Sequence, residues 1–171
     1  MGGDSNVGPL GFGDMSGGPA DNSGLPLGDP ISSRHPGDSH GGGRAIDISY
    51  YKLRASHGGV PGDANFLSPV CEHTIRGEDQ HHCVKPPHNI DYKRTAIMVG
   101  KLLESPKLRV IGVDGKIIDD LKKEIKKQCK NGGKLAGSRG CQNIHKITAE
   151  KTNTGMGWYH HHHHHLHASY Y

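Results

Sequence analysis

The sequence lacks long apolar runs and contains few aromatic residues. No apolar run of about 18 residues, the length that a membrane-spanning helix needs, occurs in the chain. Aromatic residues make up 5% of the 171 residues and hydrophobic residues 32%. We therefore expect one domain with a modest core, many loops and no membrane span, held together in part by a metal ion or by disulfides.

Several catalytic signatures are also absent. The chain has no Gly-x-Ser-x-Gly and no P-loop, which argues against a serine hydrolase and against nucleotide chemistry. The His-Glu-x-x-His helix of thermolysin-like proteases is missing too. A formal net charge of +4, with histidines neutral, discriminates little between anionic partners such as a cell-wall glycan and nucleic acid.

Glycine and proline are plentiful, and much of both lies in the first 43 residues. Residues 1–37 are expected to form an N-terminal segment that is either a disordered tail or a long ordered loop lining a cleft. Residues 38–171 are expected to form the functional domain. The N-terminus has no basic region followed by an apolar one, so no secretory signal is visible. Action outside the cytoplasm would need a removed leader, a dedicated secretion machine or host lysis.

The second half of the chain has the clearer periodicity. Apolar residues at helical spacing predict two helices, and alternating or buried apolar runs predict strands. The lysine-covered outer face of the second helix is interpreted as a solvated surface. The pattern predicts an α+β fold in which a small antiparallel sheet carries the functional site and two helices pack behind it. The expected helices are 91–104 and 117–128, and the expected strands are 45–51, 108–113, a possible one at 143–148, and a last one through the C-terminal histidines.

The four cysteines form two pairs, Cys71 with Cys83 and Cys129 with Cys141, each enclosing eleven residues. This spacing is compatible with two local disulfides in an oxidising compartment. It is equally compatible with four free thiols in a cytosolic protein. Histidines and acidic residues crowd around the first pair. The spacing of these residues matches no common zinc finger, which argues against a structural zinc. The final histidine of an HNH nuclease motif is absent from the chain, which argues against a nuclease. We therefore favour a loop that is closed by a disulfide and faces the substrate.

A histidine and an aspartate seven positions apart are the main candidates for metal binding. His40 precedes a glycine turn, and Asp47 lies in an apolar strand, so the two suit a loop-and-strand pair of zinc ligands. Zinc accepts imidazole and carboxylate ligands, and a catalytic site leaves its fourth position to water. In a final strand His165 and His167 would point to one face and Leu166 to the packed side. One histidine would then bind zinc, while the other would sit beside the bound water.

Several motifs together resemble those of the penicillin-insensitive murein endopeptidase family, which belongs with the D-Ala-D-Ala metallopeptidases and shares the fold of the hedgehog signalling domain. The chain contains Ser39-His40-x-x-Gly43-x-Ala45-x-Asp47, and an aromatic pair before a late His-x-His strand. The order of helix, short strand and helix between them is also similar. The matching segments are Gly11-Phe12-Gly13-Asp14-Met15, Gly17-Gly18-Pro19, Ile31-Ser32-Ser33-Arg34-His35, Trp158-Tyr159 and His165-Leu166-His167.

The resemblance implies a set of site residues. The zinc ligands would be His40, Asp47 and His167, with His165 as the active-site neighbour. A further family histidine, five positions before the last ligand, corresponds to His162. His165 or His162 would handle the proton and stabilise the tetrahedral intermediate. The residues expected to contact substrate are Arg34, His35 and Trp158.

The function expected from this resemblance is zinc-dependent hydrolysis of peptide bonds in the stem peptides or cross-links of peptidoglycan. The site of action would be the periplasm or the extracellular cell wall, and nucleic acid is not expected as a partner. The alternative is a non-catalytic zinc-binding module of the same fold that binds cell-wall or extracellular partners.

A run of six histidines, His160 to His165, is often a purification tag when it lies near a C-terminus. Here the run continues into Leu166-His167-Ala168, which has the character of a strand, and it follows an aromatic pair. We therefore favour a native run that belongs to the domain, and a purification tag is the alternative that stays open.

Overall fold

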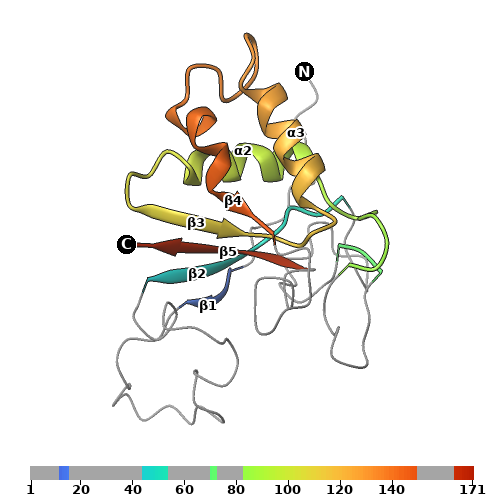
Figure 1. The fold of residues 1–171 in the computed structure, drawn as a ribbon. Coiled ribbons are helices and arrows are strands. Elements are labelled where there is room, and N and C mark those ends of the chain that lie inside the picture. The colour runs from blue at the N-terminus through green and yellow to red at the C-terminus, as the bar shows by residue number, and fades with distance from the viewer. Residues whose placement is uncertain (1–11, 16–43, 54–69, 73–82, 150–163) are drawn as a thin grey trace, which may run out of the picture.

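The computed structural model describes residues 12–15, 44–53, 70–72, 83–149 and 164–171 (Figure 1). These ranges are called the described residues below, and every structural statement concerns them. None of the helices among them combines the length and the apolar character of a membrane span.

A five-stranded sheet forms one layer of the molecule, with the strand order β1-β2-β5-β3-β4 (Figure 1). The last strand in the sequence, β5, therefore lies in the middle of the sheet. It pairs antiparallel with β2 on one side and with β3 on the other. The strands are β1 (Phe12–Met15), β2 (Ala45–Ser49), β3 (Leu108–Gly112), β4 (Ile147–Thr148) and β5 (His165–Tyr170).

The α+β class is confirmed, but the prediction of an antiparallel sheet is wrong at one edge. The strand pair β3–β4 is parallel, so the sheet is mixed. Between these two strands the chain passes through a helical layer and returns to the same end of the sheet. Such a crossover makes the second strand parallel to the first.

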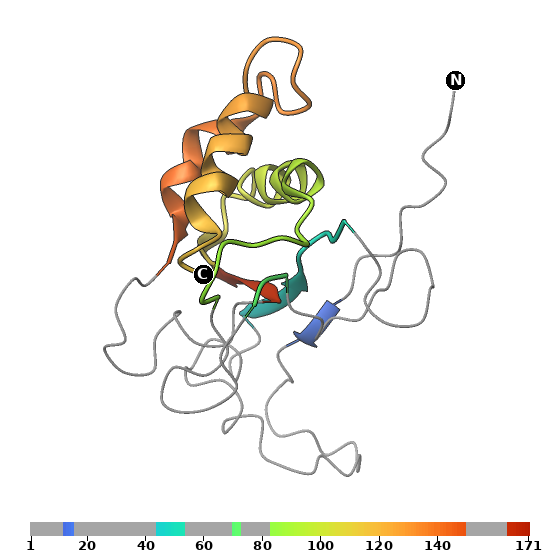
Figure 2. The same ribbon diagram turned by 90° about the vertical axis from the view of Figure 1, so that its right-hand side faces the viewer.

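The helical layer contains the two predicted helices and a third, shorter element. The helix α2 (Tyr92–Leu102) begins after Asp91, whose carboxylate accepts a hydrogen bond from the backbone N–H of Arg94 at 2.9 Å. The helix α3 (Ile118–Gln128) follows β3. Both lie on the same side of the sheet (Figure 2).

The possible strand at 143–148 is wrong for most of its length. The 3-10 helix η2 (Arg139–Lys146) occupies that region, and only the two residues of β4 are extended. Ser138 explains where η2 begins, because its hydroxyl accepts a hydrogen bond from the backbone N–H of Gly140 at 3.1 Å.

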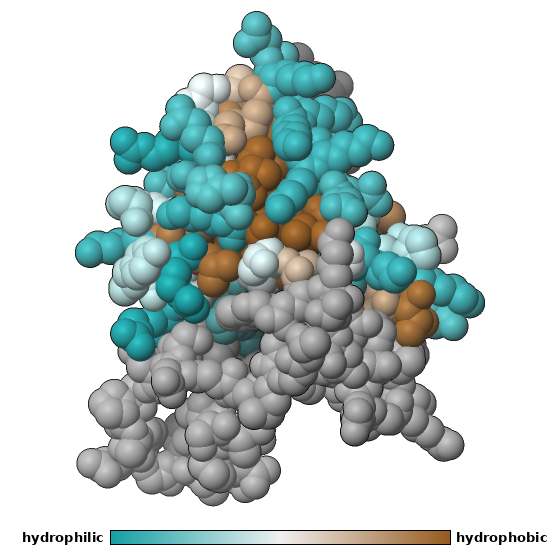
Figure 3. Space-filling view, viewed as in Figure 1, coloured by the Kyte–Doolittle hydropathy of each residue, from teal (hydrophilic) through white to brown (hydrophobic). Residues whose placement is uncertain are grey.

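The core lies between the sheet and the helices. The inward side chains of the strands include Ile48, Ile111 and Leu166, and those of α3 include Leu121 and Ile125, all of them at most 3% exposed. Leu166 thus packs on the helical side, as the alternation along the last strand predicts. Hydrophilic side chains cover much of the visible outer surface of the described part, with apolar ones showing between them (Figure 3).

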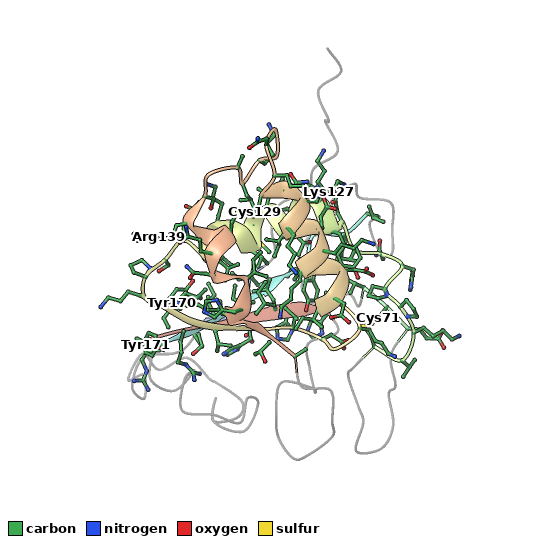
Figure 4. All side chains as sticks on the ribbon, turned by 45° about the horizontal axis from the view of Figure 1, so that its top comes forward. Cys71, Lys127, Cys129, Arg139, Tyr170 and Tyr171 are labelled. Carbon is green, nitrogen blue, oxygen red and sulfur yellow. A yellow bond between two sulfur atoms is a disulfide. The ribbon has the colours of Figure 1, made fainter. Side chains whose placement is uncertain are left out.

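Both predicted disulfides are present, Cys71–Cys83 and Cys129–Cys141, with Cα–Cα distances of 5.5 and 5.9 Å. They lie in different parts of the molecule (Figure 4). The alternative of four free thiols therefore does not describe this structure. Because Cys71 and Cys83 are bonded to each other, neither supplies a thiolate for a structural zinc.

Candidate functional site

Asp47 and His167 lie directly opposite each other on the neighbouring strands β2 and β5. Side chains at such paired positions project from the same face of a sheet and are close enough to touch. The Nδ1 atom of His167 is 2.8 Å from the Oδ1 atom of Asp47. Two of the three ligands implied by the resemblance, 120 positions apart in sequence, are therefore in contact.

His165 lies on the same side of β5 as His167, as the two-residue period of a strand predicts. Its Nε2 atom is 3.6 Å from the Oδ2 atom of Asp47. The two carboxylate oxygens of Asp47 thus face two different imidazole rings. This arrangement resembles neither a surface ion pair nor a lone core histidine.

The three side chains are deeply buried, with exposed fractions of 1% for Asp47, 2% for His165 and 3% for His167. They project from the face of the sheet opposite the helices, because the alternating neighbours Ile48, Leu166 and Ala168 belong to the core. A carboxylate taken out of water is costly unless hydrogen bonds or positive charge compensate it. A buried cluster of three titratable groups is therefore a candidate functional site.

The Asp47–His167 pair has donor atoms that suit zinc. Two ligands of a tetrahedral zinc, each about 2.0–2.1 Å from the metal, have donor atoms roughly 3.3 Å apart. The separation of 2.8 Å between Nδ1 and Oδ1 is that of a hydrogen bond, so the two atoms would have to move apart by about 0.5 Å to bind one zinc ion. Carboxylate oxygen and imidazole nitrogen are also the atoms that zinc accepts. The contact observed is a hydrogen bond, and only the types of the two donor atoms match those that zinc accepts.

Within the described ranges, no group of three or more His, Cys, Asp or Glu side chains is placed to hold a metal ion. The resemblance likewise gives His165 the place of a neighbour and not of a ligand. A third ligand would have to come from elsewhere, as the resemblance implies for His40. Five predicted site residues lie outside the described residues: Arg34, His35, His40, Trp158 and His162.

A buried aspartate that the sequence reading missed anchors the chain next to the site. Asp114, at the end of β3, accepts hydrogen bonds of 2.7 Å from the backbone N–H groups of Cys83 and Lys116. Its own N–H donates to the hydroxyl of Tyr50 at 3.4 Å. Burial, and then the charge of Asp114, raise the pKa of Tyr50 well above its usual range. These hydrogen bonds link Cys83 of the first disulfide to the segment after β3, and that segment to the end of β2.

Two further residues of the site's face were also missed. Ser169 continues the alternation of His165 and His167 along β5, and Arg109 on β3 donates to its hydroxyl. The alternation could have identified Ser169. The contact with Arg109 depends on strand pairing, which a single sequence does not show.

Comparisons of the chain with protein-family models, with curated proteins and with solved structures find no match. The class defined by fold and site is thus an α+β protein with two disulfides and a buried aspartate between two histidines.

Proposed function

We propose that this protein is a zinc-dependent peptidase that hydrolyses peptide bonds in the stem peptides or cross-links of peptidoglycan. The observation that carries the proposal is the contact between Asp47 and His167 on paired strands, at 2.8 Å. These are two of the three ligands that the resemblance implies. The disulfides are a second support, because cysteines pair in the oxidising compartments where peptidoglycan lies.

In this proposal Asp47 and His167 hold the metal together with His40. When bound there, zinc would supply an activated water at neutral pH and would polarise the scissile carbonyl. His165 or His162 accepts the proton of the attacking water and stabilises the negative charge on the carbonyl oxygen. The water oxygen would end in the new carboxylate, and both protons of the water would pass to the leaving amine, which departs as an ammonium group.

The test is digestion of purified sacculi by the full chain, first stripped of metal with a chelator and then reloaded with zinc. Released peptides are identified by mass spectrometry. We expect new peptide ends only after zinc is restored, and a loss of at least about 100-fold in rate for Asp47→Asn or His167→Ala. Asp119→Asn, an exposed residue in the first turn of α3, is the matched control. Wild-type rates in Asp47→Asn would sink the proposal.

The histidine run needs a control of its own, since adjacent histidines bind zinc whether or not an enzyme site exists. Zinc is therefore counted in a chain carrying His160→Gln, His161→Gln and His163→Gln. A single zinc should remain in this chain, and it should be lost when Asp47→Asn is added. Zinc that disappears with the run alone contradicts the proposed ligand set.

A second candidate is a non-catalytic zinc-binding module that binds cell-wall or extracellular partners. The burial of His165 favours it, because a side chain 2% exposed and 3.6 Å from Asp47 is poorly placed to exchange protons with water. Retained zinc and binding to sacculi, with no peptide released, would distinguish this module from the peptidase.

A further inference from the structure

The polar face of the sheet extends beyond the histidines toward the C-terminal end of β5. Alternate residues of a strand share a face, so His165, His167 and Ser169 project to the same side. Ser169 pairs with Ala45 on β2 and with Val110 on β3, and it is 1% exposed. A buried hydroxyl thus lies one pleat beyond the Asp47–His167 contact.

Arg109 brings a positive charge to this hydroxyl. Its Nε and Nη2 atoms lie 3.3 and 3.1 Å from the Oγ atom of Ser169, so two guanidinium N–H groups converge on one oxygen. Arg109 itself is exposed. In the part of the chain that the structure describes, no carboxylate forms an ion pair with it. A guanidinium has five N–H donors, so three remain for a ligand.

The spacing along β5 suits an extended peptide. Residues two apart on a strand are about 7 Å apart, and an extended substrate has the same repeat. A group held at Ser169 and Arg109 is therefore about two residues away from one held at His167. On the β3 side Gly112 pairs with His167, so β3 places no side chain next to that histidine.

We propose that Arg109, oriented by Ser169, binds a free carboxylate of the substrate about two residues from the bond that is cleaved. This inference rests on the proposed function and narrows its substrate class to peptides that carry such a carboxylate. Arginine suits the role because its planar fork of donors matches the two oxygens of a carboxylate.

The test uses two synthetic stem-peptide dimers that differ only in whether this carboxylate is free or amidated. Binding of each labelled peptide is measured by fluorescence anisotropy, and turnover is measured separately. The wild type should bind the free acid about 10- to 100-fold more tightly than the amide. Arg109→Gln should abolish this preference, Arg109→Lys should keep part of it, and Ser169→Ala should reduce it. Arg139→Gln, which removes the same charge from η2 in the helical layer, should leave it unchanged (Figure 4).

The outcomes separate the two claims. Equal binding of acid and amide by the wild type, no detectable binding of either, or an unchanged preference in Arg109→Gln would overturn the carboxylate subsite. A preference that depends on Arg109, with no turnover of either peptide, would support the subsite and remove the peptidase function. With turnover, Arg109→Gln should raise KM for the free acid and change kcat little.

Discussion

At the scale of single residues, the buried carboxylate of Asp47 lies between the rings of His165 and His167. A carboxylate so deeply buried depends on its partners, and a bound cation would add the largest stabilising charge. Residue-level variants can therefore separate a metal site from a purely structural cluster.

Zinc should stabilise the folded wild-type chain through Asp47. A ligand that binds only the folded state at 100 times its dissociation constant stabilises that state by about 2.7 kcal/mol. We expect zinc to raise the melting temperature of the wild type, measured by calorimetry in the chain with the substituted histidine run, and to leave Asp47→Asn unchanged. An equal zinc-induced rise in both chains would show that the metal binds elsewhere.

Tyr92 predicts how stability depends on alkaline pH. Its hydroxyl is buried and has no hydrogen-bond partner among the described residues. Burial, and then the charges of Asp120 and Asp114, raise its pKa far above its usual range. The unfolded chain therefore loses this proton before the folded chain does. The stabilisation of the folded state that comes from protonated Tyr92 is fully present below about pH 10. It falls as the pH rises from there toward the raised pKa of Tyr92 in the folded state.

Tyr92→Phe should make this alkaline fall less steep. At pH 7 the substitution should change the free energy of unfolding by less than about 1 kcal/mol, because no hydrogen bond is lost. Urea unfolding between pH 7 and 11 measures both effects. Tyr171→Phe serves as the control, since Tyr171 is 76% exposed. A Tyr92→Phe chain with the wild-type slope would contradict the assignment.

At the scale of elements, local pattern was enough to predict the helices. The helix expected at 117–128 is observed as α3 (Ile118–Gln128), because its apolar stripe repeats at helical spacing and Asn131-Gly132-Gly133 follows. The polar alternation around Asn143 misled the strand prediction. A 3-10 helix forms there because a serine cap and a disulfide fix the turn, and neither changes the hydropathy pattern.

The sequence predicted which side chains share a face of one strand, but it did not predict which strands are neighbours in the sheet. The shared face of His165 and His167 follows from the period of a strand. The pairing of Asp47 with His167 joins strands that are far apart in sequence, and nothing local specifies that β5 enters between β2 and β3. Arg109 and Asp114 were missed because their roles depend on the same nonlocal contacts.

The packing of η2 against α2 depends on Gly140. A Cβ atom at this position would overlap the backbone carbonyl oxygen of Gly100 and lie 3.3 Å from the Cβ of Leu103. Backbone atoms yield little, so Gly140→Ala should cost about 1–3 kcal/mol in the free energy of unfolding, measured with urea. Gln142→Ala, at an exposed position of η2, should change it by less than about 0.5 kcal/mol. Equal stabilities of the two variants would refute this close approach.

At the scale of the whole molecule, two disulfides of equal span close separate parts of the described chain. Each joins residues 12 apart, so chain entropy predicts that each stabilises the folded state by about 3 kcal/mol. The form with both bonds is the one expected in an oxidising compartment, which is compatible with action in the periplasm or outside the cell.

Paired substitutions test this contribution. Cys129→Ala with Cys141→Ala, and Cys71→Ala with Cys83→Ala, should each lower the free energy of unfolding by about 3 kcal/mol in non-reducing buffer. Reducing agent should destabilise the wild type and have little further effect on a chain with all four substitutions. A wild-type stability that reductant leaves unchanged would count against both bonds.

The central claim is that Asp47 and His167 hold a zinc ion that serves peptide-bond hydrolysis. The most direct measurement is the rate at which zinc-loaded chain releases new peptide ends from purified sacculi, compared between the wild type and Asp47→Asn at equal folded concentration. We expect zinc-dependent release by the wild type and at least about a 100-fold slower release by the variant. Equal rates for the two chains, or no release by the fully zinc-loaded wild type, would contradict it.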